Sequence, residues 1–133
     1  MRGLRLAAFG AVMFAAGLAL GTERAPTGWR GVSQQVLAKL DLAGEIAGAQ
    51  HRDLRLSRAT IAPGGHVPVH SHQGDPTIVY VLSGVLTNHH ADGAVRRYHA
   101  GEAFAEFGPG RHWIENAGTK AVVFLDANIH QEK

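Results

Sequence analysis

Turns rich in glycine and proline divide most of this chain into short segments that suit β-strands. Residues 78–82 form a continuous apolar run with several β-branched side chains, which is typical of a buried strand. Asp92 and Gly93 separate two more extended segments, residues 85–90 and 95–99, and favour a hairpin turn because both residue types accept positive φ. Further strands are expected within residues 32–42, 51–58, 102–107 and 121–128, with another that begins at His112. Many short strands at this spacing predict an all-β sandwich or small barrel.

Histidines in two separate segments point to a metal site. His70 and His72 are one residue apart, so on a strand both side chains project from one face, about 7 Å apart along the strand. Residues 109–116 contain a further histidine, His112, whose imidazole can close the site. Neutral imidazole suits divalent iron, manganese, nickel, copper or zinc, and three protein ligands leave positions open for water or substrate. Histidines that only hydrogen-bond to one another within a barrel are the alternative.

The first of these segments resembles a motif of the cupins, a family of small β-barrels. That motif has a glycine, a His-x-His pair, a glutamate and a second glycine at fixed spacings. Gly64, His70, His72 and Gly84 fit it. The resemblance implies a single jelly-roll barrel of short antiparallel strands.

A second cupin motif ends in Gly-x-x-His-x-x-x-Asn, and His112 and Asn116 match it, with Gly101 ahead of them. Pro109 stands at the motif's usual glycine. The resemblance covers roughly residues 61–128, and it implies one divalent metal ion held by His70, His72 and His112.

One position departs from the cupin pattern. The motif's glutamate, counted back from Gly84, falls on Thr77, so the usual carboxylate ligand is missing. Asp75 precedes it in a segment that Pro76 turns, and it is not assigned as a ligand. A neutral three-histidine set leaves a divalent ion's charge uncompensated, which favours an anionic substrate or a bound hydroxide. Glu106 can compensate this charge only if the barrel encloses it; a surface position is its default.

The other polar residues are expected to have ordinary roles. His66 has the strand parity of His70 and is a weaker candidate for the rim of the pocket. Trp113 should face away from His112, and Asn116 should cap the turn that follows it. Solvent exposure is expected for Arg111 and for the three histidines of the predicted hairpin, His89, His90 and His99.

The N-terminal residues have the pattern of a secretory signal. A basic start, residues 1–5, precedes an apolar run of about fifteen residues, shorter than the roughly 20 that a membrane-spanning helix needs. We therefore expect a signal helix over residues 1–21 that is cleaved, a linker or arm over 22–31, and a barrel domain over 32–133. This predicts a secreted or periplasmic protein without a membrane anchor after cleavage.

Charge and composition exclude other classes of function. Without Arg2 and Arg5 the chain has 11 basic side chains against 11 acidic ones, and this balance argues against a nucleic-acid partner. Cysteine is absent, so disulfides and thiolate ligands are excluded.

Two functions of different classes remain. The leading hypothesis is a metal-dependent enzyme, oxygenase-like or other, that acts on a small polar or anionic molecule. The alternative is a non-catalytic periplasmic module that binds a small molecule or the metal itself. A structural barrel is a third possibility, and an exposed N-terminal arm makes a homodimer plausible.

Overall fold

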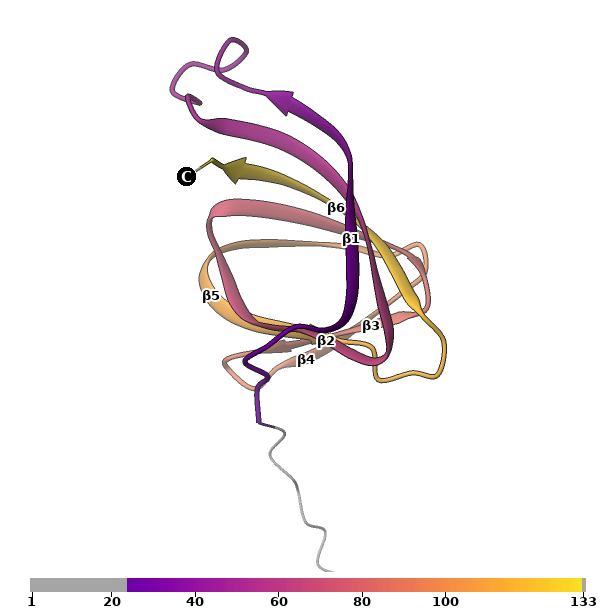
Figure 1. Ribbon diagram of the computed structural model, residues 1–133. Helices are drawn as coiled ribbons and strands as arrows, with labels where there is room; N and C mark the ends of the chain where they lie inside the picture. The colour runs from indigo at the N-terminus through magenta and orange to yellow at the C-terminus, as the bar shows by residue number, and fades with distance from the viewer. Residues whose placement is uncertain (1–23, 133) are drawn as a thin grey trace, which may run out of the picture.

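Six antiparallel strands make up the part of the chain that the computed structural model describes, residues 24–132 (Figure 1). Their bounds are β1 Arg30–Asp41, β2 Arg52–Ser83, β3 Val85–His90, β4 Val95–His99, β5 Ala103–Glu115 and β6 Val122–Gln131. The predicted all-β architecture is confirmed. The predicted signal helix, residues 1–21, lies outside the described residues, and within 24–132 no helix is long and apolar enough to span a membrane.

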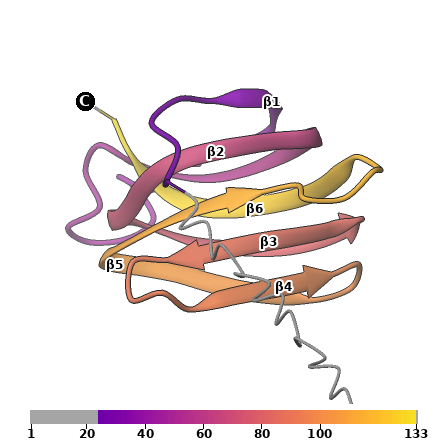
Figure 2. The ribbon, with the colours of Figure 1, turned by 90° about the horizontal axis from the view of Figure 1, so that it is seen from below.

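Strand β2 closes the barrel because it passes β6 twice. Residues 52–61 pair with β1 on one side and with β6 on the other, and residues 77–83 return along the opposite edge of β6. Between these two arms, residues 66–72 pair with β5. The ribbon therefore forms the ring in Figure 1, and Figure 2 shows β1 and β2 on one side of the molecule and β3 and β4 on the other.

The expectation of short strands was wrong for two segments. The predicted strands at 51–58 and 78–82 are parts of one strand, β2, which has 32 residues. Likewise, the strands expected within 102–107 and from His112 onward are parts of one strand, β5, which bends at Gly108. Glycines with positive φ bend these strands without ending them, with φ values of 72° at Gly64, 78° at Gly74 and 73° at Gly108. Strand β1 also begins at Arg30, inside the segment expected to be a linker.

The predicted hairpin is confirmed, but its turn differs from the expectation. Strands β3 and β4 have the expected bounds, and only Gly93 has positive φ, at 88°. The Asp92 carboxylate instead accepts a hydrogen bond of 2.9 Å from the backbone N–H of Ala94. The aspartate thus stabilises the turn through its side chain rather than by adopting positive φ.

The core fills one part of the barrel and leaves another part open. Its buried apolar residues are Ala59, Ile61, Val67, Val79, Val81, Leu86, Ile114, Val122 and Phe124. Gly84 links β2 to β3 beside this core with φ of 79°, and a Cβ there would lie 2.8 Å from the carbonyl oxygen of Ala121. Both the backbone angle and the close approach therefore require glycine at this position.

Candidate metal centre

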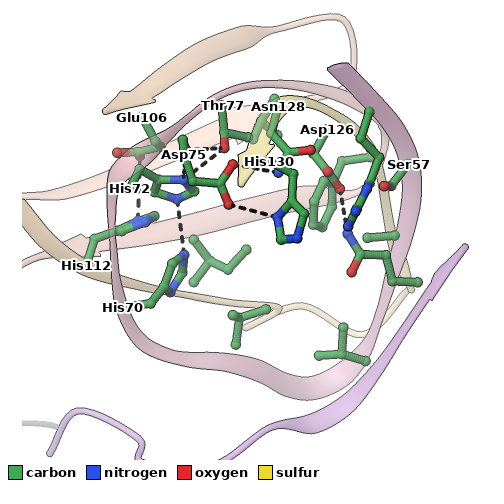
Figure 3. Close-up of a pocket in the computed structure, with 18 of the residues that line it drawn as sticks. Ser57, His70, His72, Asp75, Thr77, Glu106, His112, Asp126, Asn128 and His130 are labelled. Atoms are coloured by element: carbon green, nitrogen blue, oxygen red, sulfur yellow. Dashed lines mark hydrogen bonds and ion pairs between the residues drawn. The ribbon is translucent and has the colours of Figure 1, made fainter. Parts of the chain in front are cut away.

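The barrel brings the three predicted histidines together. His70 and His72 project from β2, and His112 projects from β5 at the position paired with His70. Their ring centroids are separated by 4.3 to 5.1 Å, and one nitrogen from each lies within 4.8 Å of the others (Figure 3). The arrangement can hold a metal ion.

Hydrogen bonds on the far side of each ring fix which nitrogen faces the cluster. Every Nδ1 atom lies against oxygens, which accept, so each Nδ1 carries the proton and each Nε2 keeps a free lone pair. The Nδ1 contacts are Pro68 O at 2.8 Å for His70, Asp75 O at 3.0 Å for His72, and Asn88 Oδ1 at 2.9 Å for His112. Partners of this kind orient the histidines of metal sites.

The lone pairs of the three Nε2 atoms have neither a hydrogen-bond donor nor a cation to bind among the described residues. Those of His70 and His72 are 3.2 Å apart, so two lone pairs face one another unless a proton or a cation lies between them. The Nε2 atom of His112 is buried and has no hydrogen-bond partner among the described residues. Two nitrogens that bind one ion at 2.0–2.1 Å lie about 3.0–3.4 Å apart. The His70 and His72 nitrogens have this separation, and together with His112 they could hold a metal ion.

Burial keeps the imidazoles of His70 and His112 neutral, as metal ligation requires. Burial of His112, with smaller contributions from the neighbouring His70, His72 and His90, lowers its pKa to about 3. Burial also lowers the pKa of His70, although the hydrogen bond to Pro68 opposes this shift. Both side chains therefore offer lone pairs at neutral pH.

Thr77, at the position of the missing glutamate, contacts a ligand candidate without contacting the centre. Its hydroxyl oxygen lies 2.8 Å from Nδ1 of His72, which donates to it, and the hydroxyl donates to the carbonyl oxygen of Asp75 at 3.0 Å. The threonine thus orients His72 from behind.

The carboxylate of Glu106 enters the barrel, against the default expectation of a surface position. Glu106 pairs with Thr77 across β2 and β5, and its side chain is 13% exposed. It accepts a hydrogen bond from the amide of Asn88, and its Oε1 atom lies 3.6 Å from Nδ1 of His112. A negative charge therefore lies behind the histidine cluster and offsets part of a bound cation's charge.

Asn88 is a functional residue that sequence reasoning missed. It is completely buried, and its amide joins His112 to Glu106. The sequence feature that could have identified Asn88 is its position in the predicted hairpin strand 85–90. In the structure this strand, β3, pairs with β5, which carries His112. Solvent exposure was expected for the histidines of this hairpin, and no motif singled out Asn88 beside them.

His66 does not reach the centre. Val67 lines the cavity instead, and an irregularity in the pairing between Val67 and His70 changes the inward parity of β2 before His70. The parity argument failed for this reason.

Two of the hairpin histidines are partly buried, which corrects the expectation of solvation. His89 donates a hydrogen bond of 2.7 Å from Nε2 to the carboxylate of Glu115 and stacks on Trp113 with ring centroids 3.8 Å apart. His90 stacks on His112 at 6.0 Å, whereas His99 is exposed as expected. Trp113 is absent from the cavity lining, as its parity predicted.

Asn116 caps its turn as predicted. Its side-chain oxygen accepts a hydrogen bond of 3.0 Å from the N–H of Gly118. Its amide also donates to the carbonyl oxygens of Ile61 and Lys120, which ties two segments of the barrel together.

A cavity of about 390 Å³ opens in front of the histidines. This volume lies at the low end of the roughly 300–1,000 Å³ range of small-molecule sites. Its walls combine apolar side chains, among them Val79, Phe104 and Phe124, with a set of polar ones. The polar residues beyond the histidine cluster are Gln34, Arg55, Ser57, Asp75, Thr77, Glu106, Asp126, Asn128 and His130.

An antiparallel barrel with a small-molecule cavity and an interior histidine cluster defines a class of protein, the β-barrels that can bind a metal ion within their fold. A family model described as the cupin domain matches residues 57–128, more than half of the chain. The chain therefore belongs to the cupin family.

Individual relatives agree with this assignment. The chain is 36% identical over 94 residues to germin-like protein 3-1 of Oryza sativa subsp. japonica, a match that covers 68% of this chain but 42% of that protein. A predicted oxalate decarboxylase from Thermotoga maritima is 26% identical, with a TM-score of 0.59 over 74% of this chain and 79% of the other. A cupin-2 domain from Rhodospirillum rubrum shares the fold, with a TM-score of 0.60, 22% identity, and coverage of 79% and 64% of the two chains.

Proposed function

We propose that this cupin binds one divalent metal ion through the Nε2 atoms of His70, His72 and His112 and acts as a metal-dependent enzyme on a small polar molecule. The observation that carries the proposal is the convergence of three lone pairs whose rings are fixed by hydrogen bonds at Nδ1. When bound, such an ion would supply Lewis acidity or oxygen-activating chemistry, and three ligands leave it open positions.

The side chains around the cluster favour a neutral or weakly charged substrate. Glu106, Asp75 and Asp126 contribute three carboxylates to the cavity, and Arg55 contributes one guanidinium. A divalent ion would bring the formal charge of this set to zero. A strongly anionic ligand would then meet carboxylates without a compensating excess of positive charge, which disfavours it.

The apolar part of the cavity wall limits the access of water to the histidines. Val79, Phe104 and Phe124 limit the water in front of the histidines, and this strengthens the electrostatic interactions of a bound polar group. The amide of Asn88 holds the Glu106 carboxylate in place, so its charge stays behind the cluster during ligand exchange.

A non-catalytic binding module is the second candidate, and one observation favours it. The cluster of potential ligand atoms contains no carboxylate, because Thr77 replaces the family glutamate. Glu106, whose Oε1 atom lies 3.6 Å from Nδ1 of His112, accepts a hydrogen bond from Asn88 and lies on the Nδ1 side of that ring. A site built in this way can capture a metal ion or a metabolite without converting it.

The name of one similar protein points to a different ligand. The Thermotoga maritima relative is described as a predicted oxalate decarboxylase, and oxalate is a small dianion, which the charge balance of this cavity disfavours. We also propose that the chain is exported, from its basic and apolar N-terminal pattern, and that it forms a homodimer. Recovery of the protein from the periplasm or the medium tests export, and size-exclusion chromatography with light scattering tests the dimer.

Elemental analysis of protein purified without chelator tests the metal site. We expect about one equivalent of iron, manganese, nickel, copper or zinc, lost in a His70→Ala His112→Ala variant and retained in His99→Ala, whose histidine is exposed. Absence of any bound ion, even after reconstitution with each metal, would exclude the proposal. Oxygen-consumption and hydrolysis assays on the loaded protein then separate an enzyme from a binding module.

A further inference from the structure

The cavity has a second polar wall, opposite the histidines. Figure 3 shows the histidine cluster on one side of the cavity and Ser57 and Asp126 on the other. Ser57 and Arg55 come from the first arm of β2, and Asp126 and Asn128 come from β6. All four side chains line the same cavity as the histidines.

Several atoms of this wall are buried without a hydrogen-bond partner. Among residues 24–132, the Nε atom of Arg55 and the Oδ1 atom of Asn128 are unpartnered. The hydroxyl of Ser57 makes no hydrogen bond of good geometry, although it lies near enough to Asp126 to lower the pKa of that carboxyl slightly. Ser57 is only 1% exposed, so bulk water does not satisfy its hydroxyl. Unpaired polar atoms are costly inside a protein, and each one needs an explanation.

Asp126 adds a buried carboxyl group to the wall. It is 8% exposed, accepts a hydrogen bond of 3.0 Å from Gln34, and forms no ion pair with any described residue. Burial, together with the negative charge of Asp75, raises its pKa. The inward side of β6 thus changes from Phe124 in the core to the polar Asp126 and Asn128, a pattern that barrel packing does not require.

The hydrogen-bonding groups of this wall that have no partner include both donors and acceptors. Arg55 can only donate, Asn128 Oδ1 can only accept, and Ser57 can do both. A ligand carboxylate would accept from Arg55 but would meet the carboxylate of Asp126. An ammonium group would donate to Asn128 but could accept nothing from Arg55. A hydroxyl group donates and accepts, so adjacent hydroxyls satisfy the whole set.

We propose that Ser57, Asp126, Asn128 and Arg55 bind the hydroxyl groups of a small polyhydroxylated ligand, whose other end faces the histidine cluster. The inference rests on the proposed function, because the same ligand would be the one presented to the metal ion. It narrows the ligand class from small polar molecules to polyols and sugars.

The test compares hydroxylated probes with charged probes of similar size. Binding to the full barrel, at its measured metal content, is followed by ¹H–¹⁵N NMR titration with meso-erythritol, D-xylose and D-glucose, and separately with oxalate, succinate and 1,4-diaminobutane. Ser57→Ala and the near-isosteric Asp126→Asn remove parts of the wall. Thr60→Ala removes a hydroxyl from the same arm of β2 outside this cavity and serves as the matched control.

We expect at least one hydroxylated probe to bind, with shifts centred on the first arm of β2 and on β6. Affinity should fall about tenfold in Ser57→Ala and in Asp126→Asn, as for the loss of one buried hydrogen bond, and should stay within about twofold in Thr60→Ala. Metal content should not change in any of the three variants. If Ser57→Ala does not fold, Asp126→Asn and the shift map of the unaltered protein decide the question.

Binding of only the charged probes, or no binding of any hydroxylated probe, would overturn the inference. An equal loss of affinity in Thr60→Ala would do the same. If only the proposed metal function is wrong, the protein would take up no metal, but hydroxylated probes would still bind and their affinity would still depend on Ser57. A protein that takes up metal and ignores every hydroxylated probe would refute the inference alone.

Discussion

Removal of the Asn88 amide should weaken both the barrel and its metal site. The side chain is fully buried, accepts from Nδ1 of His112 and donates to Glu106. Asn88→Ala leaves both partners buried and unsatisfied, at about 1–3 kcal/mol each, so we expect the free energy of unfolding of the metal-free protein to fall by about 4 kcal/mol. Metal affinity should fall 10- to 100-fold, because His112 loses the partner that orients its ring. Urea denaturation and competition with a chelator measure the two effects.

A second buried asparagine separates the two effects. Asn116 is 1% exposed and donates to two backbone carbonyls away from the histidines. Asn116→Ala should therefore lower stability by a similar amount and leave the affinity of the folded protein for metal unchanged. If both variants lost the same metal affinity, or if Asn88→Ala lost none, the assigned role of Asn88 in orienting His112 would be refuted.

Three further substitutions probe Gly84 between β2 and β3, the glutamate position of the cupin motif, and the cavity wall. Gly84→Ala should lower the free energy of unfolding by about 1–3 kcal/mol in urea denaturation, because φ is positive and the carbonyl of Ala121 blocks a Cβ; a loss under about 0.5 kcal/mol would contradict this. Thr77→Glu should tighten metal binding about tenfold or more in chelator competition and destabilise the metal-free protein, because the new carboxylate lies beside Glu106; unchanged affinity would argue against ligation from this position. Because the pKa of Asp126 is raised above the ordinary 3.8, the folded chain keeps a proton that the unfolded chain has lost, and stability falls as pH rises through that window. Asp126→Asn abolishes this fall, so its stability relative to the unaltered protein should be greater at pH 7 than at pH 3; the same difference at both pH values would show that the carboxyl is not perturbed.

Much of the fold could be predicted because local signals agreed with the final structure. The β-branched run at 78–82 and the Asp92-Gly93 turn specify extended segments and a hairpin without any knowledge of distant contacts. The continuity of β2 and β5 could not be predicted in this way. Glycine at positive φ ends one strand and bends another, and only the long-range pairing with β6 and β5 decides between the two outcomes.

The residues of the site can be separated in the same way, into those that local spacing identifies and those that depend on long-range strand pairing. The His-x-His spacing places His70 and His72 on one face of a strand, so sequence alone identified this pair. The roles of Asn88 and Glu106 depend on which strands become neighbours, and the failure for His66 depends on an irregularity in strand pairing. Ser57 and Asp126 carried no motif at all. Their significance lies in burial without partners, which a sequence does not record.

The position of β6 between the two arms of β2 also constrains how the chain folds. Residues 52–61 and 77–83 have no direct pairing with one another and meet only through this last strand. Both arms must therefore wait with unpaired edges until β6 has been synthesised, and the barrel closes in a single late step that spans long sequence separations. Such contacts form slowly, and open strand edges are prone to aggregation meanwhile. For a nascent chain, the hazardous interval is the time between synthesis of Ser83 and synthesis of Gln131.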